Sequence, residues 1–506
     1  VYYNPAGLTK LSDGLHLSIS NQTLGQTKNV VNDFNYLNGT PVDYQGDVSA
    51  PMFPGFYAAY KTGKVVFSFG FNPIGGGGSA DFAAGLPSIE MPASTLVPSF
   101  ASQGMDVTGY SLSMNFSGTS VYFGFQAGVS YEINDMLSVY AGGRYIMAKN
   151  TYKGEIKDVM VSSTSKGDMA PGAYLTSLAG DATAGATAAT GGGDNLQAAF
   201  DAGLLDPAYP INGVTDPEGA VTGGLLALGY TQAEINGMDM GDAQTSFYTS
   251  AAILTGTAAQ LTAMSPVVAA QTADQEADVE QTGSGFTPIV GVNLSLMEDK
   301  LNIGIKYEFK TNLELTNNTT SDVTTKWDMA GQPTGSMFSD GEIINADMPA
   351  MLSIGVRYEL MEGLNVHAGF HTYFDKQVGW IKTVNDIDYT AEDFIDKNSM
   401  EYALGLEYNI NEKLLVSAGW LGTNTGVNDL YQSDLSYSIN TNSFGAGGAF
   451  AINDMITIQL GGFMTMYQDA TVAKEYNLGD MVPYNETYKK SAWGIGVGLD
   501  FTFGGK

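Results

Sequence analysis

The chain has 506 residues, of which 44% are hydrophobic and only 15% are charged, and it contains no cysteine. Acidic residues outnumber basic ones by 53 to 22, which gives a formal net charge of −31. This composition excludes disulfide scaffolds and thiolate metal sites and disfavours nucleic-acid binding, and no apolar run approaches the ~18 residues of a transmembrane helix.

The predicted strands alternate apolar and polar side chains, from a first strand at residues 14–22 to a last one at 493–503. In residues 300–309 the odd positions are all apolar, whereas the even ones are Lys, Asn, Gly, Lys and Glu. Because successive side chains of a strand point to opposite faces, each strand has one apolar and one polar face. A soluble sandwich also alternates, but aromatic residues such as Tyr307, Tyr358 and Phe501 at the ends of apolar faces favour a membrane barrel.

Six short turns rich in Asn, Asp, Glu and Gly separate the strands. Asn, Asp and Gly suit tight turns because they tolerate positive φ and bond their own backbone. Six turns at one rim imply seven hairpins open to the other side, which makes 14 strands. The sequence therefore predicts an all-β fold, a 14-stranded antiparallel transmembrane barrel over residues 14–503, in the outer membrane of a Gram-negative bacterium. The turns lie at residues 60–65, 131–137, 294–301, 358–364, 408–414 and 450–456.

The third predicted strand, residues 65–71, runs into Asn-Pro and then into four glycines. Proline cannot donate to a sheet ladder and glycine weakens one, so we expect an interruption here. It is either a kink that opens the barrel wall or simply the outer end of the strand. The residues at the expected interruption are Gly70, Phe71, Asn72 and Pro73.

A long insert, residues 150–284, follows the fifth predicted strand and holds 16 acidic residues against three lysines. It is too long for a plain loop, and it carries helix signals that include a capping box from Thr231 to Glu234. Phe247, Leu254 and Leu261 recur at helical spacing on one face. They form either the core of a helical extracellular cap or an open apolar groove.

Four cations fall on the inward parity of their strands and are predicted to face the lumen. They could bind a ligand carboxylate, or they could pair with lumen acids or with a plug. His367 and His371 are ~13 Å apart on one strand and cannot share a metal ion, so neither metal nor cofactor is expected. No nucleophile has a specific base partner, so we predict no enzyme activity. The predicted lumen cations are Arg144, Lys306, Lys310 and Arg357.

The tripeptide Asn4-Pro5-Ala6, ahead of a 14-stranded barrel with a large third loop, resembles the FadL/TodX/OmpP1 family of outer-membrane transporters. That family includes aromatic-hydrocarbon channels of the TodX type. The resemblance implies a lumen plug, or hatch, whose end maps to residues 1–13 and whose closing motif maps to Asn4, Pro5 and Ala6. It also implies a kinked third strand that opens the wall sideways.

The function that this resemblance implies is passive transport of fatty-acid-like or aromatic molecules. They would pass from an extracellular groove through a plugged lumen to a lateral exit, with the ligand and outer-membrane lipid as partners. Since a fatty acid gains ~0.8 kcal/mol per buried methylene, exit into the bilayer avoids a costly release into water. The alternative is a structural or cargo-docking subunit of an outer-membrane secretion or assembly complex, which binds a protein partner at the extracellular loops.

Overall fold

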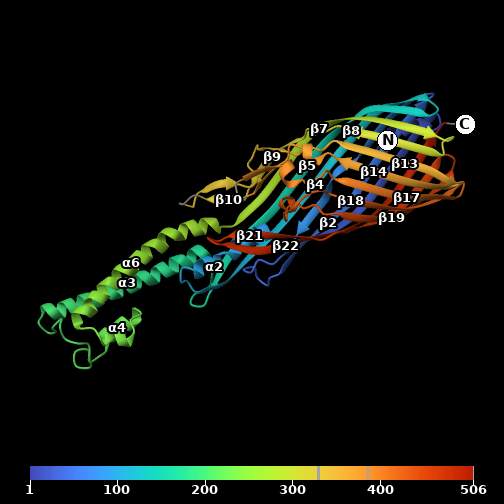
Figure 1. The fold of residues 1–506 in the computed structure, drawn as a ribbon. Helices are drawn as coiled ribbons and strands as arrows, with labels where there is room; N and C mark the ends of the chain where they lie inside the picture. The colour runs from blue at the N-terminus through green and yellow to red at the C-terminus, as the bar shows by residue number, and fades with distance from the viewer. Residues whose placement is uncertain (328–330, 385–386, 505–506) are drawn as a thin grey trace.

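The computed structural model describes residues 1–327, 331–384 and 387–504. Within these ranges, 14 antiparallel strands pair in sequence order and the last pairs with the first, which closes the predicted barrel (Figure 1). The barrel strands are β1 Gly14–Asn32, β2 Val42–Thr62, β3 Val65–Phe82, β4 Val107–Asn134, β5 Leu137–Ser163, β7 Gln275–Leu296, β8 Leu301–Glu308, β13 Met351–Met361, β14 Leu364–Tyr373, β17 Met400–Asn411, β18 Leu414–Asn424, β19 Thr441–Asn453, β20 Ile456–Tyr467 and β22 Met481–Phe503.

The six predicted short turns join β2 to β3, β4 to β5, β7 to β8, β13 to β14, β17 to β18 and β19 to β20. In three of them an asparagine side chain holds the turn. The Oδ1 atoms of Asn134, Asn411 and Asn453 each accept hydrogen bonds from the amides two and three residues further on. These side-chain bonds are the physical basis of the repeated turn pattern.

The outer surface of the barrel is apolar, as β22 illustrates. Trp493, Ile495 and Val497 are each about half exposed there, with exposed fractions of 49, 56 and 51%. They alternate with glycines, Gly494 and Gly496, on the inward parity. Side chains this large and this exposed indicate a lipid-facing wall.

The strands β4 and β5 have 28 and 27 residues, far more than the 9–11 that a membrane crossing needs. β5 stays paired with β7 from Leu137 opposite Leu294 to Ile156 opposite Gln275. The ladder between β5 and β7 therefore continues into both ends of the predicted insert at 150–284, and the helices occupy its middle.

A helical arm projects from the barrel end opposite to the short turns and the two chain termini (Figure 1). It consists of α3 (Pro171–Asp201) and α6 (Met240–Gln271), which pack together, with the short helices α4 (Ala220–Ala227) and α5 (Gln232–Ile235) between them. A Cβ on Gly172 would lie only 2.6 Å from the Cβ of Ala269, so glycine permits the close helix approach. Within the described residues, α6 is the one helix long and apolar enough to cross a membrane by length and composition. The sequence did not predict such a helix, because threonines, glutamines and Pro266 interrupt its apolar run.

The remaining elements lie mainly in the loops at the extracellular end. Two short helices, α1 and α2, follow β3, and β9 and β12 extend the wall beyond β8 and β13. Their bounds are α1 Pro87–Ser94, α2 Leu96–Ala101, β6 Gly167–Met169, β9 Glu314–Ser321, β10 Thr324–Trp327, β11 Pro333–Ser336, β12 Ile343–Asn345, β15 Ile381–Val384, β16 Ile387–Thr390, α7 Ala391–Phe394 and β21 Ala470–Asn477, with single 3-10 turns at Pro5–Lys10, Asp375–Gln377 and Asp429–Tyr431.

Candidate functional site: a lumen cavity beside a gap in the wall

The N-terminal segment lies inside the barrel, where the 3-10 turn Pro5–Lys10 contacts β3, β4, β5 and β7. The Asn4 side chain caps this turn by accepting from the amide of Gly7, and its Nδ2 donates to Asn293 Oδ1 at 2.7 Å. The Ser130 hydroxyl donates to the Pro5 carbonyl, and Ala6 is fully buried. All three residues of the Asn-Pro-Ala motif thus fix the segment to the barrel wall.

A buried charge cluster anchors the start of the same segment. Glu308 accepts from Arg144 at 2.7 Å and from Lys306 at 2.6 Å, and both cations are only 3% exposed. Lys306 also donates to the Tyr2 carbonyl, and both cations lie within 5 Å of the Tyr2 ring centroid. Two of the four predicted lumen cations therefore lie together, but they are engaged by Glu308 and the N-terminal segment.

The other two predicted lumen cations lie elsewhere. The Lys310 ammonium pairs with Asp347 at 2.7 Å, and the guanidinium of Arg357 donates to the carbonyl of Asp299 in a short turn. Arg144 and Lys306 meet at the wall formed by β5 and β8, whereas Lys310 and Arg357 each have a separate partner. The four cations therefore do not form one anion-binding site.

Replacing Glu308 with glutamine is expected to destabilise the protein by about 3–5 kcal/mol, because Arg144 and Lys306 would remain buried without a counter-charge. Urea unfolding measures this loss. Glu155→Gln is the matched control, since its pair with Lys157 is partly exposed to solvent and its loss should cost far less. Equal losses in the two variants would contradict the anchoring role of Glu308.

A cavity of about 1190 Å³ occupies the opposite side of the lumen, against β14, β17 to β20, β22 and β1. It exists because the inward-facing residues of these strands are small. Their lipid-facing neighbours are large, and Leu404 and Leu460, for example, are 58 and 61% exposed. The wall of this cavity is therefore mostly backbone. Its inward-facing glycines are Gly369, Gly405, Gly419, Gly445, Gly447, Gly461, Gly496 and Gly498.

The ladder between β2 and β3 is interrupted by a gap. Phe56 pairs with Phe71 on one side of it and Ser49 with Ser79 on the other, whereas residues 50–55 and 72–78, all described, form no pairs with each other. Pro51, Pro54 and Pro73 lie in this gap and cannot donate ladder hydrogen bonds. On the β4 side, β3 carries bulges at the same place.

The predicted interruption of the third strand is therefore present, but it differs from the prediction in two respects. β3 continues to Phe82, so the interpretation that Asn-Pro ends the strand is wrong. Gly70 and Phe71 remain paired with β2, and the gap begins only at Asn72. The strand continues because β4 still pairs with β3 beyond the proline.

The gap lies within the lipid-facing band of the barrel. On β1, Gly25 pairs with Ser49 and with Trp493, and Ile19 pairs with Phe56 and with Leu499. The gap thus lies between the levels of Trp493 and Leu499, both of which are exposed on the apolar outer wall.

The cavity reaches the strand beside the gap. Ser20, Asn21 and Gln22 of β1 line the cavity and pair with Gly55, Pro54 and Phe53 of β2, whose other edge borders the gap. Strand β2 therefore separates the cavity-lining residues of β1 from the interrupted ladder.

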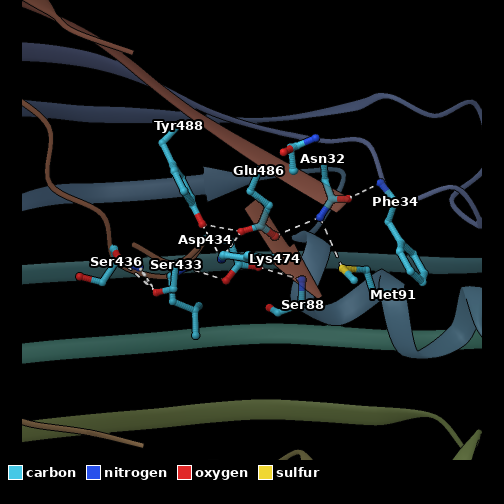
Figure 2. A network of polar contacts seen from close by, with 12 residues as sticks. Asn32, Phe34, Ser88, Met91, Ser433, Asp434, Ser436, Lys474, Glu486 and Tyr488 are labelled. Carbon is cyan, nitrogen blue, oxygen red and sulfur yellow. Dashed lines mark hydrogen bonds and ion pairs between the residues drawn. The ribbon is translucent and has the colours of Figure 1, made fainter. Parts of the chain in front are cut away.

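An inward loop, residues 429–439, fills the extracellular end of the barrel above the cavity. Tyr437 packs on Tyr488 at 4.9 Å between ring centroids and is buried with Val30, Tyr44 and Ile439. Asp434 accepts from the amide of Ser88 in α1, which links the loop to another extracellular segment (Figure 2).

The same network ties this loop region to the barrel wall. Figure 2 shows Glu486 contacting Asn32, Lys474 and Tyr488, so that β1, β21 and β22 share one buried carboxylate. Nearby, Glu90 of α1 accepts from Tyr44 at 2.5 Å and from Tyr110 at 2.6 Å. Polar contacts thus connect several segments at the extracellular end of the barrel.

Asp434 gives this network of contacts a pH dependence. Burial raises the pKa of its carboxyl above the ordinary value. Its contribution to stability is therefore fully present below the unfolded pKa of about 3.9, and it is lost as the pH rises through the raised value. Asp434→Asn removes the charge but keeps an acceptor for Ser88, so we expect its melting temperature relative to the wild type to increase with pH. Thermal unfolding at about pH 4 and about pH 8 tests this, and an unchanged difference would contradict it.

The predicted extracellular groove is not an open surface. Phe247 and Leu261 are buried, with exposed fractions of 4 and 8%, and Leu254 lies against Gly185 of α3. The apolar stripe of α6 faces α3, and around Phe247 it is also covered by α4 and α5. Phe247 and Leu261 therefore belong to the packing core of the arm, Leu254 packs half-buried against α3, and the groove interpretation is corrected.

The sequence model of the family described as outer membrane protein transport protein (OMPP1/FadL/TodX) matches residues 226–503, more than half of the chain. The chain belongs to this family. Membership in the OMPP1/FadL/TodX family, together with the closed barrel, makes it an outer-membrane transport protein of a Gram-negative bacterium.

Solved structures share the fold of this OMPP1/FadL/TodX member at low identity. A Pseudomonas aeruginosa FadL homologue is 10% identical with a TM-score of 0.55, and the match covers 99% of this chain and 93% of that one. The toluene transporter TodX of P. putida is 14% identical with a TM-score of 0.51 and the same coverage. No curated protein matches the sequence.

Two features of the site escaped the sequence analysis although signals for them were present. Pro51 and Pro54 lie only three residues apart within β2, and such prolines mark a strand with an unpaired edge. Glycines at alternate positions of the later strands, such as Gly445 and Gly447, mark a wall without side chains on its inner face. The inward loop carries no such signal, since its burial depends on contacts between segments far apart in the chain.

Proposed function

We propose that this protein is a passive channel that passes hydrophobic small molecules from the outside, through the lumen cavity, into the outer membrane by way of the gap between β2 and β3. The observation that carries the proposal is the interrupted ladder beside the cavity, at the level of the lipid-facing band. Family membership supports transport, and the side exit is our inference.

The chemistry of a side exit is favourable for an apolar ligand. Each buried methylene is worth about 0.8 kcal/mol, so release into water would cost a long-chain molecule many times the thermal energy. A ligand that moves from the backbone-lined cavity into lipid keeps its apolar surface out of water. The N-terminal segment, held by Asn4, Pro5 and Ala6, supports this route because it fills the lumen beside β4, β5 and β7.

Uptake by cells tests the channel directly. A host that lacks its own channels of this family should take up a radiolabelled alkane faster when it expresses this protein, and an uncoupler should not reduce the initial rate of entry into the outer membrane. An unchanged rate, together with a stoichiometric copurified protein and a lumen free of apolar ligand, would instead favour the docking-subunit alternative. The projecting arm of α3 and α6 is the observation that favours that alternative.

A further inference from the structure

The lumen cavity contains no cation. Its lining residues, all within the described chain, include one ionisable acid, Glu407, and one histidine, His367, but no lysine or arginine. The remaining wall is backbone, aliphatic and aromatic side chains, and neutral polar groups. The charge that a ligand meets in this cavity is therefore negative.

None of the four cations predicted to face the lumen lines this cavity. Arg144 and Lys306 are held by Glu308 on the opposite wall, and Lys310 is held by Asp347. Arg357 pairs in register with His367, but its guanidinium donates to the carbonyl of Asp299 in the turn between β7 and β8. A carboxylate ligand that shed its hydration on entering the cavity would find no counter-ion among the lining residues, and an unpaired charge without its hydration is costly. Repulsion from the carboxylate of Glu407 would add to that cost.

His367 offers the complementary feature, an unused hydrogen-bonding atom. Its Nε2 is buried and has no hydrogen-bond partner. Gly405 lies opposite it on β17, so no side chain from that strand fills the space in front of the ring. Because Nε2 is covered, a ligand hydroxyl would bond it when the imidazole turns toward the cavity, and the bond would satisfy an atom that is otherwise unpaired.

Glu407 is fixed near the same site. It pairs in register with Asn365, which lies two residues before His367 on the same face of β14, and the Asn365 amide lies 3.4 Å from a Glu407 carboxylate oxygen. The acid and the imidazole thus belong to adjacent strands of one wall.

We propose that the cavity selects uncharged apolar molecules that carry a single hydroxyl group, with His367 bonding the hydroxyl and Glu407 excluding carboxylates. This inference rests on the proposed function and narrows its substrate class from fatty-acid-like or aromatic molecules to neutral ones.

Equilibrium binding of three matched probes to the purified full chain tests the selectivity: hexadecanol, hexadecanoate and hexadecane, at about pH 8, where a carboxylic acid is ionised. We expect hexadecanol to bind about tenfold or more tightly than hexadecanoate. Glu407→Gln should bring this ratio toward one. His367→Leu should weaken the binding of hexadecanol about tenfold and leave the binding of hexadecane unchanged. If His367 had only a structural role, its loss would weaken the binding of both probes.

A gain-of-function variant keeps the test independent of lost stability. Ser417 lines the cavity and pairs in register with Glu407, so Ser417→Lys should introduce the missing cation and strengthen hexadecanoate binding. Glu401→Gln is the control for Glu407→Gln, because Glu401 lies on the same face of β17 but outside the cavity lining.

The outcomes separate the two proposals. Equal affinity of the wild type for hexadecanol and hexadecanoate, or an unchanged ratio in Glu407→Gln, overturns the selectivity but leaves the channel intact. Failure of all three probes to bind overturns the proposed function itself.

Discussion

Uptake of hydrophobic molecules is expected to fall about tenfold or more when Gly405 and Gly461 are both replaced by phenylalanine. These glycines face the cavity from β17 and β20, so two aromatic rings would occupy the ligand's space. The barrel should still fold. A Cβ at either position would be at least 3.5 Å from its nearest neighbour, which is ordinary van der Waals contact. The initial rate of alkane uptake by cells measures the effect.

The control places the same side chains on the opposite face of the same strands. Leu404 and Leu460 precede the two glycines and are exposed on the lipid-facing surface. Leu404→Phe with Leu460→Phe should therefore leave uptake unchanged. If the inward and outward pairs reduced uptake equally, the cavity would not be the route.

Closing the gap between β2 and β3 is expected to stop release of ligand into the membrane while the cavity still binds it. Between the paired residues that border the gap, β2 has residues 50–55 and β3 has residues 72–78, so β3 is one residue longer. Deleting Gly76, which has a φ of +86°, equalises the two strands. Replacing Pro51, Pro54 and Pro73 with valine would then restore the missing donors.

Two readouts distinguish a closed gap from a damaged barrel. Restored ladder hydrogen bonds, each worth about 1 kcal/mol, should raise the melting temperature, whereas uptake should fall about tenfold or more. The deletion of Gly76 without the valine substitutions is the control, because Pro51, Pro54 and Pro73 still cannot donate ladder hydrogen bonds. Undiminished uptake in the more stable, closed variant would refute the side exit.

The barrel was predictable because its determinants are local. Alternation and turn chemistry act over a few residues, and Asn134 and Asn453 make the same turn bonds that their sequence contexts suggest. The strand lengths were less predictable, since extension of β4 and β5 beyond the membrane depends on their pairing with each other and with β7.

The site was only partly predictable, for a different physical reason. Inward parity identified Arg144 and Lys306, but only the fold brings Glu308 and Tyr2 into contact with them. Likewise, helical spacing identified Phe247 without indicating that α3 covers it. Periodicity determines which face a side chain occupies, whereas its partner comes from a distant segment.

Photo-crosslinking of a diazirine-labelled hydrophobic ligand to the protein in a lipid bilayer, followed by peptide mapping, tests the central claim most directly. The proposed route predicts labelled peptides from the cavity wall, for example residues 443–449, and from the gap at residues 50–55 and 72–78. The double phenylalanine variant should lose both. Labelling confined to the outer lipid-facing surface, or of the cavity without the gap, would contradict passage through the lumen and out between β2 and β3.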